Sequence, residues 1–368
     1  MLYNYLNRIF LGGVIMEKLI INKTTSPKEK PACISSFGTI FTDHMVVMEY
    51  TKDKGWHNLR IEPYGPVALD PSACVLHYGQ GVFEGLKAYK TKEGKVQLFR
   101  ARDNFERLNR SCRKVCIPEV DVDLLMLALS ELLKLEYDWI PNQEGTSLYI
   151  RPFIIASEAF LGVRPAIQYK LFIILSPVGA YYPEGLKPVK ILVEEKYVRA
   201  VRGGLGEAKT MANYAASLLA AEEAKQKGFS QVLWLDGVER KYVEEVGTMN
   251  IFFKINGTVI TPALNGSILP GITRDSVIKV LKKWGIPVEE RRISIDEVVS
   301  ASQDGSLEEI FGTGTAAVIS PVGKMSYNNE EILLDNYDSN SLAIKLYNYI
   351  TGLQYGTESD EFNWVKNI

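Results

Sequence analysis

Residues 203–209 read GGLGEAK and end in Lys209, which lies between a glycine-rich stretch and a segment rich in alanine. The alanine-rich segment, residues 213–228, ends in lysines and Gly228, a combination typical of a helix C-terminus. A lysine at the junction of a flexible loop and a helix can point into a cavity, where it can form a Schiff base with an aldehyde. The spacing alone does not distinguish this role from that of an ordinary surface lysine.

Two further segments offer a carboxylate and a phosphate site. Residues 244–250 read EEVGTMN and place a glutamate at the start of an apolar strand, where it can pair with a cationic ring nitrogen or simply face solvent. Residues 269–274 read LPGITR, and a glycine turn that leads into a helix presents backbone N–H groups and a helix dipole to a phosphate. The alternative for this segment is an ordinary helix with Thr273 as its N-cap.

A fourth segment, residues 312–317, reads GTGTAA and fits a dinucleotide-binding pattern. That fingerprint needs a helix to follow, and residues 318–321 indicate a strand ended by a proline, so we reject a Rossmann site. A hydroxyl-rich glycine turn can still hold a phosphate or a carboxylate through its N–H groups. Together the four segments offer an amine, a carboxylate and two phosphate-binding turns, which match the aldehyde, ring nitrogen and phosphate of pyridoxal phosphate. The residues alone do not identify a substrate.

Hydrophobic periodicity and turn signals predict a chain of mixed strands and helices. Two hairpins are predicted, one joining residues 86–90 to 95–99 and one joining residues 250–255 to 258–261 across Asn256-Gly257. Further strands are predicted at residues 41–51, 147–156, 169–176, 189–194, 232–235, 308–311 and 316–321. Helices are predicted from Asp103 as N-cap to Cys116, and at residues 121–138, 213–228, 273–285 and 341–355.

The length of the chain, 368 residues, exceeds what one ordinary core needs and predicts two domains. The boundary is predicted in a turn-rich stretch that includes YPEG at residues 182–185. The predicted division is an N-terminal extension (1–36), a small domain (37–176), an interdomain loop (177–187) and a large cofactor-binding domain (188–368). Met16 is an alternative to Met1 as the start of the product.

Composition and charge indicate a soluble, cytoplasmic protein. Hydrophobic residues make up 46% and charged residues 23%, and the net charge is -2, so neither nucleic acid nor membrane is an expected partner. No apolar stretch approaches membrane-spanning length. Cys112 and Cys116 could supply two ligands of a metal site, but the sequence contains no second Cys or His pair that would complete it. We therefore expect no metal site. We expect the cysteines to be buried thiols; they are Cys33, Cys74, Cys112 and Cys116.

From about Phe37 onward the chain closely resembles the branched-chain amino acid aminotransferases, which are fold type IV pyridoxal-phosphate enzymes. The strings that carry this resemblance are FG at 37–38, FTDHM at 41–45, HY at 77–78, FEG at 83–85, SLYIRP at 147–152, QVLWL at 231–235, EVGTMN at 245–250 and LPGITR at 269–274. The resemblance implies a two-domain α/β fold, with a small N-terminal α/β domain and a larger C-terminal domain that has a β-barrel-like core. It also implies transamination of L-leucine, L-isoleucine and L-valine with 2-oxoglutarate, giving branched-chain 2-oxo acids and L-glutamate.

The resemblance also implies roles around the cofactor, pyridoxal 5'-phosphate. Lys209 would bind the cofactor covalently and then move a proton between the substrate Cα and C4′ of the cofactor. Glu245 would keep the ring nitrogen protonated, and Tyr214 would hydrogen-bond the 3′ oxygen. Thr248 would also lie at the cofactor. The phosphate would be held by a bidentate Arg107, by the backbone N–H groups of Ile272 and Thr273, and by the hydroxyl of Thr315.

The substrate pocket implied by the same resemblance consists of Phe37, Tyr78, Phe83, Tyr149, Arg151, Thr248, Ala316 and Ala317. Its aromatic walls suit aliphatic side chains. Tyr78 and backbone N–H groups near Ala316 would receive the α-carboxylate. Because one pocket must accept both an apolar and an anionic side chain, we expect Arg151 to meet the distal carboxylate of glutamate.

Other functions remain open at this point. A D-amino acid aminotransferase or an aminodeoxychorismate lyase of the same fold would share the lysine, the glutamate and the phosphate cradle. The strings at residues 37–45 and 245–250 favour the branched-chain group. A non-catalytic pyridoxal-phosphate carrier is the alternative from another class, and the complete set of pocket residues argues against it. Family members are usually homodimers in which the neighbouring subunit partly closes the active site, so the resemblance implies a homodimer.

Overall fold

The computed structural model describes residues 10–11, 14–15, 19–31, 37–179, 186–328, 330–334 and 337–368. The two possible start residues and the YPEG stretch lie outside the described residues. The chain divides into two compact units, of which unit 1 comprises Met1–Tyr181 and Leu353–Ile368 and unit 2 comprises Tyr182–Gly352. The domain boundaries expected from the sequence stay a prediction.

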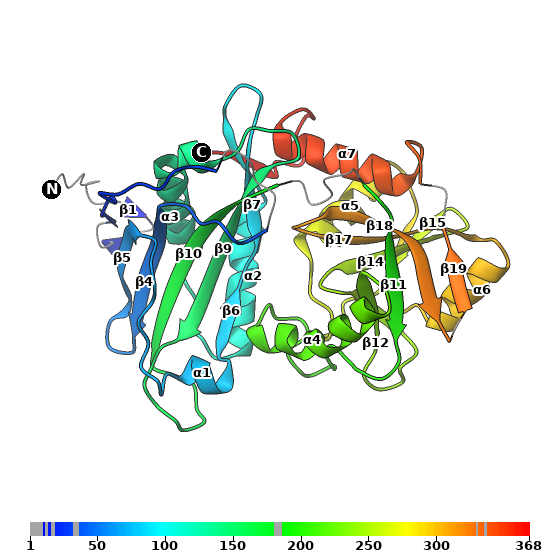
Figure 1. The fold of residues 1–368 in the computed structure, drawn as a ribbon, viewed down its shortest axis with the longest axis horizontal. Coiled ribbons are helices and arrows are strands. Elements are labelled where there is room, and N and C mark those ends of the chain that lie inside the picture. The colour runs from blue at the N-terminus through cyan, green and yellow to red at the C-terminus, as the bar shows by residue number, and fades with distance from the viewer. Residues whose placement is uncertain are drawn as a thin grey trace. The chain divides into compact units, whose positions relative to one another are not determined.

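Unit 1 is built on a largely antiparallel sheet with the strand order β20-β8-β7-β9-β10-β4-β5-β3, and β6 pairs with β9 (Figure 1). Its strands are β3 (Ile20–Ile21), β4 (His44–Thr51), β5 (Gly55–Pro63), β6 (Gly81–Phe83), β7 (Leu86–Lys90), β8 (Val96–Phe99), β9 (Ser147–Ala156), β10 (Gln168–Val178) and β20 (Val365–Asn367). The predicted hairpin of β7 and β8 and the predicted bounds of β9 are confirmed. β10 continues through Pro177 and Val178, which the sequence had assigned to the interdomain loop.

The two faces of β9 have different surroundings. Leu148, Ile150 and Ile154 belong to the unit 1 core, which they share with residues of α2 (Ala101–Lys114) and α3 (Val122–Leu135). Because side chains alternate along a strand, Tyr149 and Arg151 point to the opposite face. One face of β9 therefore contributes to the core, and the other carries Tyr149 and Arg151.

The start of α2 differs from the prediction. Arg100, not Asp103, is the N-cap, with a left-handed φ of 52° that joins β8 directly to the helix. Asp103 lies in the first turn, where its carboxylate accepts a hydrogen bond from Arg100 Nε at 2.5 Å and complements the helix dipole. An aspartate in the first turn has the same sequence signature as a cap, which explains the error. The predicted start of α3 is confirmed, because Asp121 accepts hydrogen bonds from the backbone N–H groups of Asp123 and Leu124.

The cysteines do not share one environment. Cys74, on the short helix α1 (Cys74–Tyr78), and Cys112 are buried, and burial raises the pKa of the Cys112 thiol to about 12. Cys116 is exposed, which corrects the expectation that it is buried. Its φ of 56° ends the helical path after α2 and turns its side chain outward. Cys33 lies outside the described residues.

Residues 353–368 complete unit 1. β20 pairs with β8 as an edge strand, and Ile368 packs against the unit 1 core. Tyr355 donates a hydrogen bond from its hydroxyl to the carbonyl of Thr146 at 2.8 Å. Trp364 packs its ring against Phe99 at a centroid distance of 5.7 Å. This segment is therefore an integral part of the unit 1 fold.

Unit 2 contains a second sheet, with the order β13-β12-β11-β18-β17-β14-β15-β16, and β19 pairs with β18 (Figure 1). Its strands are β11 (Val189–Glu194), β12 (Gln231–Leu235), β13 (Val243–Val246), β14 (Asn250–Ile255), β15 (Thr258–Thr261), β16 (Val288–Glu290), β17 (Leu307–Gly314), β18 (Val318–Tyr327) and β19 (Glu330–Leu333). β11 runs parallel to both β12 and β18, and β16 runs parallel to β15. The sheet curls into a half-barrel around a core that includes Leu233, Ile251, Phe253 and Ile310. This confirms the expected α/β fold with a barrel-like core.

The helices of unit 2 are α4 (Met211–Gln226), α5 (Ile272–Lys283), α6 (Ile295–Gln303) and α7 (Leu342–Tyr355), whose last three residues count with unit 1. α5 begins at Ile272 with Gly271 as its N-cap, so Thr273 is not the cap. A Cβ at Gly271 would lie 2.0 Å from Asn250 Oδ1, which explains why the cap position is a glycine. β17 continues through Gly314, which places the turn at residues 315–317 and corrects the predicted turn.

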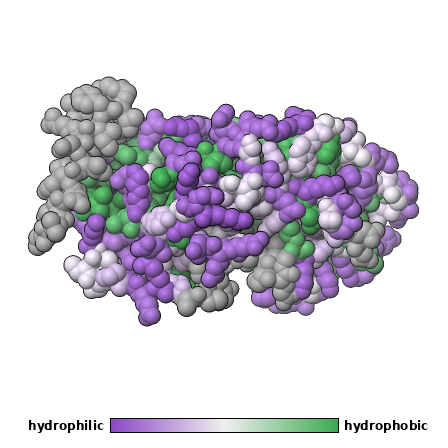
Figure 2. Space-filling model, turned by 90° about the horizontal axis from the view of Figure 1, so that it is seen from above, coloured by the Kyte–Doolittle hydropathy of each residue, from purple (hydrophilic) through white to green (hydrophobic). Residues whose placement is uncertain are grey.

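The exterior is mainly polar. Figure 2 shows one face on which hydrophilic residues predominate and hydrophobic residues form smaller areas between them. This is the surface expected around buried hydrophobic cores such as those of unit 1 and unit 2. Among the described residues, no helix has both the length and the apolar character needed to cross a membrane.

Candidate active site

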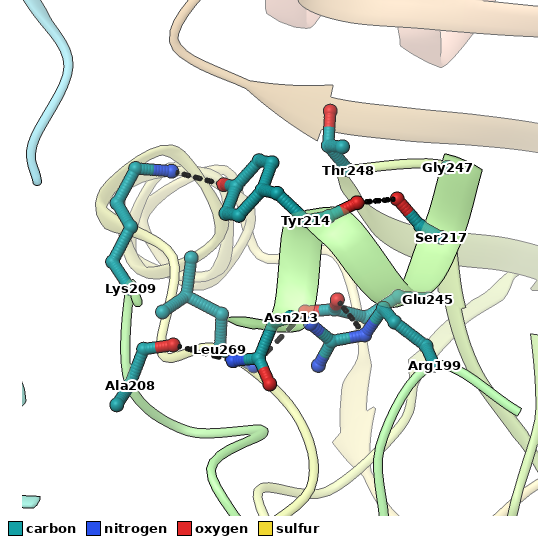
Figure 3. A pocket seen from close by; sticks show the side chains of 10 residues that line it. All are labelled: Arg199, Ala208, Lys209, Asn213, Tyr214, Ser217, Glu245, Gly247, Thr248 and Leu269. Carbon is teal, nitrogen blue, oxygen red and sulfur yellow. Dashed lines mark hydrogen bonds and ion pairs between the residues drawn. The ribbon is translucent and has the colours of Figure 1, made fainter. Parts of the chain in front are cut away.

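A pocket in unit 2 gathers residues from four separate parts of the chain (Figure 3). They come from the segment before Lys209, from the first turns of α4, from the end of β13 and from the loop before α5. The pocket is lined by Arg199, Ala208, Lys209, Asn213, Tyr214, Ser217, Glu245, Gly247, Thr248 and Leu269. Four residues expected at the cofactor therefore lie together, namely Lys209, Tyr214, Glu245 and Thr248.

Lys209 is held at the start of α4. Its Nζ donates a hydrogen bond to the hydroxyl oxygen of Tyr214 at 2.6 Å (Figure 3). The loop before it is fixed by Asn213, whose Nδ2 donates to the carbonyls of Leu205 and Ala208 at 2.7 and 2.8 Å. Asparagine is well suited to this position, because its side-chain amide donates hydrogen bonds to loop carbonyls that the N–H groups of the helix do not reach. The local fold thus directs one lysine amine and one phenol into the pocket.

Glu245 supplies a buried carboxylate from β13, with 3% of its side chain exposed. Its Oε1 accepts hydrogen bonds from the backbone N–H of Leu269 at 2.9 Å and from Asn250 Nδ2 at 3.2 Å. Burial raises the pKa of Glu245, and the charge of Arg199 together with the Leu269 N–H opposes this rise. Such a carboxylate is suited to face a cationic ring nitrogen, which would lower its pKa again.

Arg199 is the main site residue that sequence reasoning missed. Its Nε lies 2.8 Å from Glu245 Oε2, off the direction of a good hydrogen bond, so the contact is an ion pair. Its NH2 group donates to the carbonyls of Gly206 and Ser267 at 3.1 and 2.5 Å. Arg199 thereby ties together the loop before Lys209, the loop before α5 and the carboxylate. The only sequence signal was that a buried glutamate needs a cation, and that signal does not say which one.

A second carboxylate lies behind the first. Glu244 is buried, and its Oε1 accepts a hydrogen bond from the hydroxyl of Ser267. Burial raises the pKa of Glu244, while the Ser267 hydrogen bond and the charge of Arg199 oppose the rise. Because neighbouring residues of a strand face opposite sides, only Glu245 faces the pocket.

The two turns expected to hold a phosphate are both present in unit 2. Ile272 and Thr273 form the first turn of α5, where backbone N–H groups and the helix dipole favour an anion. Thr315, Ala316 and Ala317 form the turn between β17 and β18. β17 pairs with β14 so that Thr313 lies opposite Asn250, the residue that also contacts Glu245.

Four of the expected substrate residues form one cluster in unit 1. The rings of Phe37 and Tyr149 meet edge to face with centroids 4.8 Å apart. Arg151 lies over the rings of Phe83 and Tyr149 at 4.8 and 5.2 Å and donates from NH2 to the Tyr149 hydroxyl at 2.9 Å. Tyr78 lies at the end of α1, where its hydroxyl donates to the carbonyl of Leu161.

Arg107 is also in unit 1, on α2. Its Nε and NH2 groups donate to the two carboxylate oxygens of Glu84 at 2.8 and 2.9 Å, and both side chains are buried. One edge of the guanidinium group is therefore already taken by a carboxylate. The expected phosphate contact of Arg107 stays a prediction, and it would have to use the other edge. In the described parts of the chain, no group of three or more His, Cys, Asp or Glu residues could hold a metal ion.

The chemistry of the unit 2 pocket fits pyridoxal phosphate. An amine lies beside a phenol, a buried carboxylate carries its own counterion, and α5 begins beside Leu269, which donates to that carboxylate. These are the partners that an aldehyde, a ring oxygen, a ring nitrogen and a phosphate require.

Comparison with known proteins identifies the class. Residues 81–325 match the family described as "Amino-transferase class IV", and the chain belongs to this family of aminotransferases. The chain is 59% identical over 348 residues to "Branched-chain-amino-acid aminotransferase 2" of Bacillus subtilis, covering 95% of this chain and 96% of the relative. It is 55% identical over 356 residues to "Branched-chain-amino-acid transaminase 1" of the same organism, covering 96% of this chain and 100% of the relative.

Solved structures agree with this assignment. The crystal structure of the branched-chain amino acid aminotransferase of Escherichia coli matches with a TM-score of 0.72 and 27% identity, covering 87% of this chain and 98% of that chain. The branched-chain aminotransferase of the archaeon Thermoproteus uzoniensis, solved with norvaline, matches with a TM-score of 0.73 and 26% identity, covering 88% of this chain and 99% of that chain. The resemblance to branched-chain aminotransferases is thus confirmed, and a D-amino acid aminotransferase or a lyase is not favoured.

Proposed function

We propose that the protein uses pyridoxal phosphate to transfer amino groups from L-leucine, L-isoleucine and L-valine to 2-oxoglutarate. The observation that carries the proposal is the 2.6 Å hydrogen bond between Lys209 and Tyr214, in a pocket that also contains the buried Glu245. The identity of more than half of its residues with proteins named branched-chain aminotransferases supports this substrate class.

When bound, pyridoxal phosphate supplies an aldehyde that takes up the amino group and a ring that withdraws electrons from the substrate Cα. Lys209 acts as the base that takes the Cα proton and returns it at the cofactor carbon. Tyr214 holds the lysine amine and donates its phenol proton toward the ring oxygen. Glu245 holds a proton on the ring nitrogen through its negative charge.

The remaining predicted site residues bind and orient. The first turn of α5 and the hydroxyl of Thr315 hold the phosphate, with Arg107 as a third partner. Thr248, Ala316 and Ala317 line the pocket near the reacting atoms. In unit 1, Phe37, Phe83 and Tyr149 offer apolar surface to the branched side chains, and Arg151 meets the distal carboxylate of glutamate. Tyr78 receives the α-carboxylate.

We further propose a homodimer in the cytoplasm, with small amino acids and 2-oxo acids as the ligands. The family resemblance supports the dimer, and sedimentation of the purified protein tests it. A monomer that is fully active would overturn it.

The function is tested by the absorbance spectrum of the protein loaded with pyridoxal phosphate. Leucine should remove the visible or near-ultraviolet band, and 2-oxoglutarate should restore it, because the amino group passes through the enzyme in two half-reactions. Lys209→Ala should abolish both changes, whereas Lys227→Ala, an exposed lysine at the end of α4, should leave them intact. If D-alanine removes the absorbance band and leucine does not, the assignment of branched-chain substrates is wrong.

A further inference from the structure

Glu244 is a buried carboxyl group that the proposed chemistry does not use. Only 2% of its surface is exposed, and it lies on β13 immediately before Glu245. Its Oε1 contacts the hydroxyl of Ser267, which is fully buried in the loop before α5. Its Oε2 is buried and has no hydrogen-bond partner in the described part of the chain. An ionised oxygen without a donor is costly in a protein interior, so this environment favours the neutral acid.

The hydrogen bonds of Ser267 require one more proton than its own hydroxyl supplies. Its Oγ lies 2.7 Å from Asn265 Oδ1 and also contacts Glu244 Oε1. Asn265 Oδ1 is an acceptor, because it also accepts the backbone N–H of Ser267 at 3.1 Å. If the hydroxyl donates to Glu244, two oxygens face each other across the 2.7 Å to Asn265 with no proton between them. A proton on Glu244 fills both contacts, since Glu244 then donates to Ser267 and Ser267 donates to Asn265.

One guanidinium group, that of Arg199, acts on both glutamates of β13. Its Nε forms an ion pair with Glu245 Oε2 at 2.8 Å (Figure 3), and its charge also reaches Glu244. If both glutamates were ionised, one cation would have to neutralise two buried anions. With a proton on Glu244, the charge of Arg199 serves Glu245 alone.

Other acidic side chains nearby oppose the ionisation of Glu244. Asp236, in the loop after β12, accepts hydrogen bonds from four backbone N–H groups. These bonds outweigh the effect of its burial and lower the pKa of Asp236, so it carries a negative charge. The carboxylate of Glu207 lies beside the loop before α5, where it would be 4.0 Å from a Cβ at Gly266. Burial and the charge of Asp236 raise the pKa of Glu244 above its ordinary value.

We propose that Glu244 is a positioning residue that works as a neutral carboxylic acid. By donating to Ser267 it holds the loop before α5, from which the backbone N–H of Leu269 donates to Glu245. By staying uncharged it leaves the charge of Arg199 to Glu245, which faces the ring nitrogen of pyridoxal phosphate as an anion. This inference rests on the proposed function, because it assigns Glu244 a task that serves the role of Glu245.

Infrared difference spectroscopy of the full-length protein, with and without pyridoxal phosphate, tests the proton directly. Subtracting the spectrum of Glu244→Gln from that of wild type at neutral pH should reveal the C=O stretching band of a protonated carboxyl group. Glu222→Gln is the matched control, because Glu222 is an exposed glutamate on α4, and its difference spectrum should contain only bands of an ionised carboxylate. Bands of an ionised carboxylate in the Glu244→Gln difference spectrum would overturn the proposal.

The positioning role is tested by the affinity for pyridoxal phosphate. Glu244→Gln keeps a donor for Ser267 and should bind the cofactor within about threefold of wild type. Glu244→Leu has a similar volume but no donor, so it should bind about fivefold more weakly or worse, the loss expected when a buried partner is removed. Glu222→Leu is the control and should bind as wild type does.

Ser267→Ala removes the other partner of the same contact, and it decides the question if Glu244→Leu does not fold. It should weaken cofactor binding to a similar extent as Glu244→Leu. Wild-type affinity in either variant would show that the contact does not position the loop.

A protonated Glu244 also predicts a pH dependence of stability. Because its pKa is raised in the folded protein, the proton favours folding, and this contribution is lost as the pH rises from the ordinary pKa of a glutamate through the raised pKa of Glu244. The midpoint of urea unfolding of wild type should therefore fall over this range relative to that of Glu244→Gln, which stays neutral. A constant difference between the two midpoints would overturn the neutral assignment.

Failure of the wild-type protein to convert leucine would overturn the proposed function, whereas the infrared band of Glu244 would still be present. An ionised Glu244 would overturn this inference and leave the transaminase proposal standing. The two failures are therefore distinguishable.

Discussion

Arg199 joins three parts of the cofactor pocket through a single guanidinium group. It neutralises Glu245 and also binds the carbonyls of the loops that precede Lys209 and α5. Breaking a buried ion pair by removing one partner typically costs about 3–5 kcal/mol, because the remaining charge is left uncompensated. The behaviour of Glu245 as a carboxylate therefore depends on a residue that does not contact the bound ring in our proposal.

We expect Arg199→Ala to weaken the binding of pyridoxal phosphate by about tenfold or more. Without Arg199 the pKa of Glu245 rises further, and a neutral carboxylic acid cannot pair with a protonated ring nitrogen. Affinity is lost as the pH falls through the pKa of Glu245, so the variant should lose affinity at a higher pH than wild type. A fluorescence titration of the apoprotein at several pH values measures this.

Arg202→Ala is the matched control, because Arg202 is exposed and close in sequence. Arg199→Lys provides a second variant that keeps the charge and should retain part of the affinity. If Arg199→Ala binds the cofactor like wild type at every pH, Glu245 does not need this partner.

The site residues differ in how far the sequence could reveal them. Lys209, Tyr214 and Glu245 lie in recognisable strings, and the structure brings them into one pocket. Arg199 lies outside those strings, and its partner is on a strand far along the chain, so no local pattern could pair them. The Glu84 contact of Arg107 was missed for the same reason.

At the scale of elements, the loop before α4 depends on one glycine. A Cβ on Gly206 would lie 2.2 Å from the carbonyl oxygen of Ser267, and backbone atoms cannot move aside as a flexible side chain can. Arg199 binds the carbonyls of both residues and so holds the two loops at this separation.

Gly206→Ala should therefore separate the loops, displace Lys209 and lower the free energy of unfolding by about 1–3 kcal/mol. It should also slow the leucine half-reaction, which single-turnover absorbance measures. Gly65→Ala is the control, since no atom lies within 4 Å of a Cβ there. A half-reaction at the wild-type rate would show that the close approach is not needed to place Lys209.

Elements with a strong local pattern were predicted best. The alternation along β9 and the Asn256-Gly257 turn between β14 and β15 fixed the bounds of these strands correctly. Helix starts were harder, because Asp103 and Thr273 have the chemistry of caps but are the third and second residues of their helices. The observed N-caps are Arg100, which has a left-handed backbone, and Gly271, where a Cβ would collide with Asn250. A sequence pattern for capping residues contains neither feature.

At the scale of the whole molecule, the cores of unit 1 and unit 2 contribute much of the stability. Leu129 is fully buried in the unit 1 core, so Leu129→Ala should lower the free energy of unfolding by about 2–5 kcal/mol.

Pyridoxal phosphate at a hundred times its dissociation constant should raise the free energy of unfolding by about 2.7 kcal/mol, because only the folded protein binds it.

Thermal unfolding with and without cofactor measures both effects. Leu129→Ala should keep the rise caused by the cofactor, whereas Lys209→Ala should reduce it. A cofactor effect lost in Leu129→Ala would show that the core of unit 1 is coupled to the pocket in unit 2.

The sequence could not assign residues 353–368 to unit 1, because the pairing of β20 with β8 joins segments far apart in the chain. This topology has a consequence for biosynthesis. A nascent chain folds from its N-terminus as it leaves the ribosome, but here the first unit lacks its edge strand until the whole of the second has been made. Until then the backbone groups at the edge of β8 are unpaired by β20, and the part of the unit 1 core that Ile368 covers is exposed. We expect a chaperone to bind the nascent chain at this exposed edge.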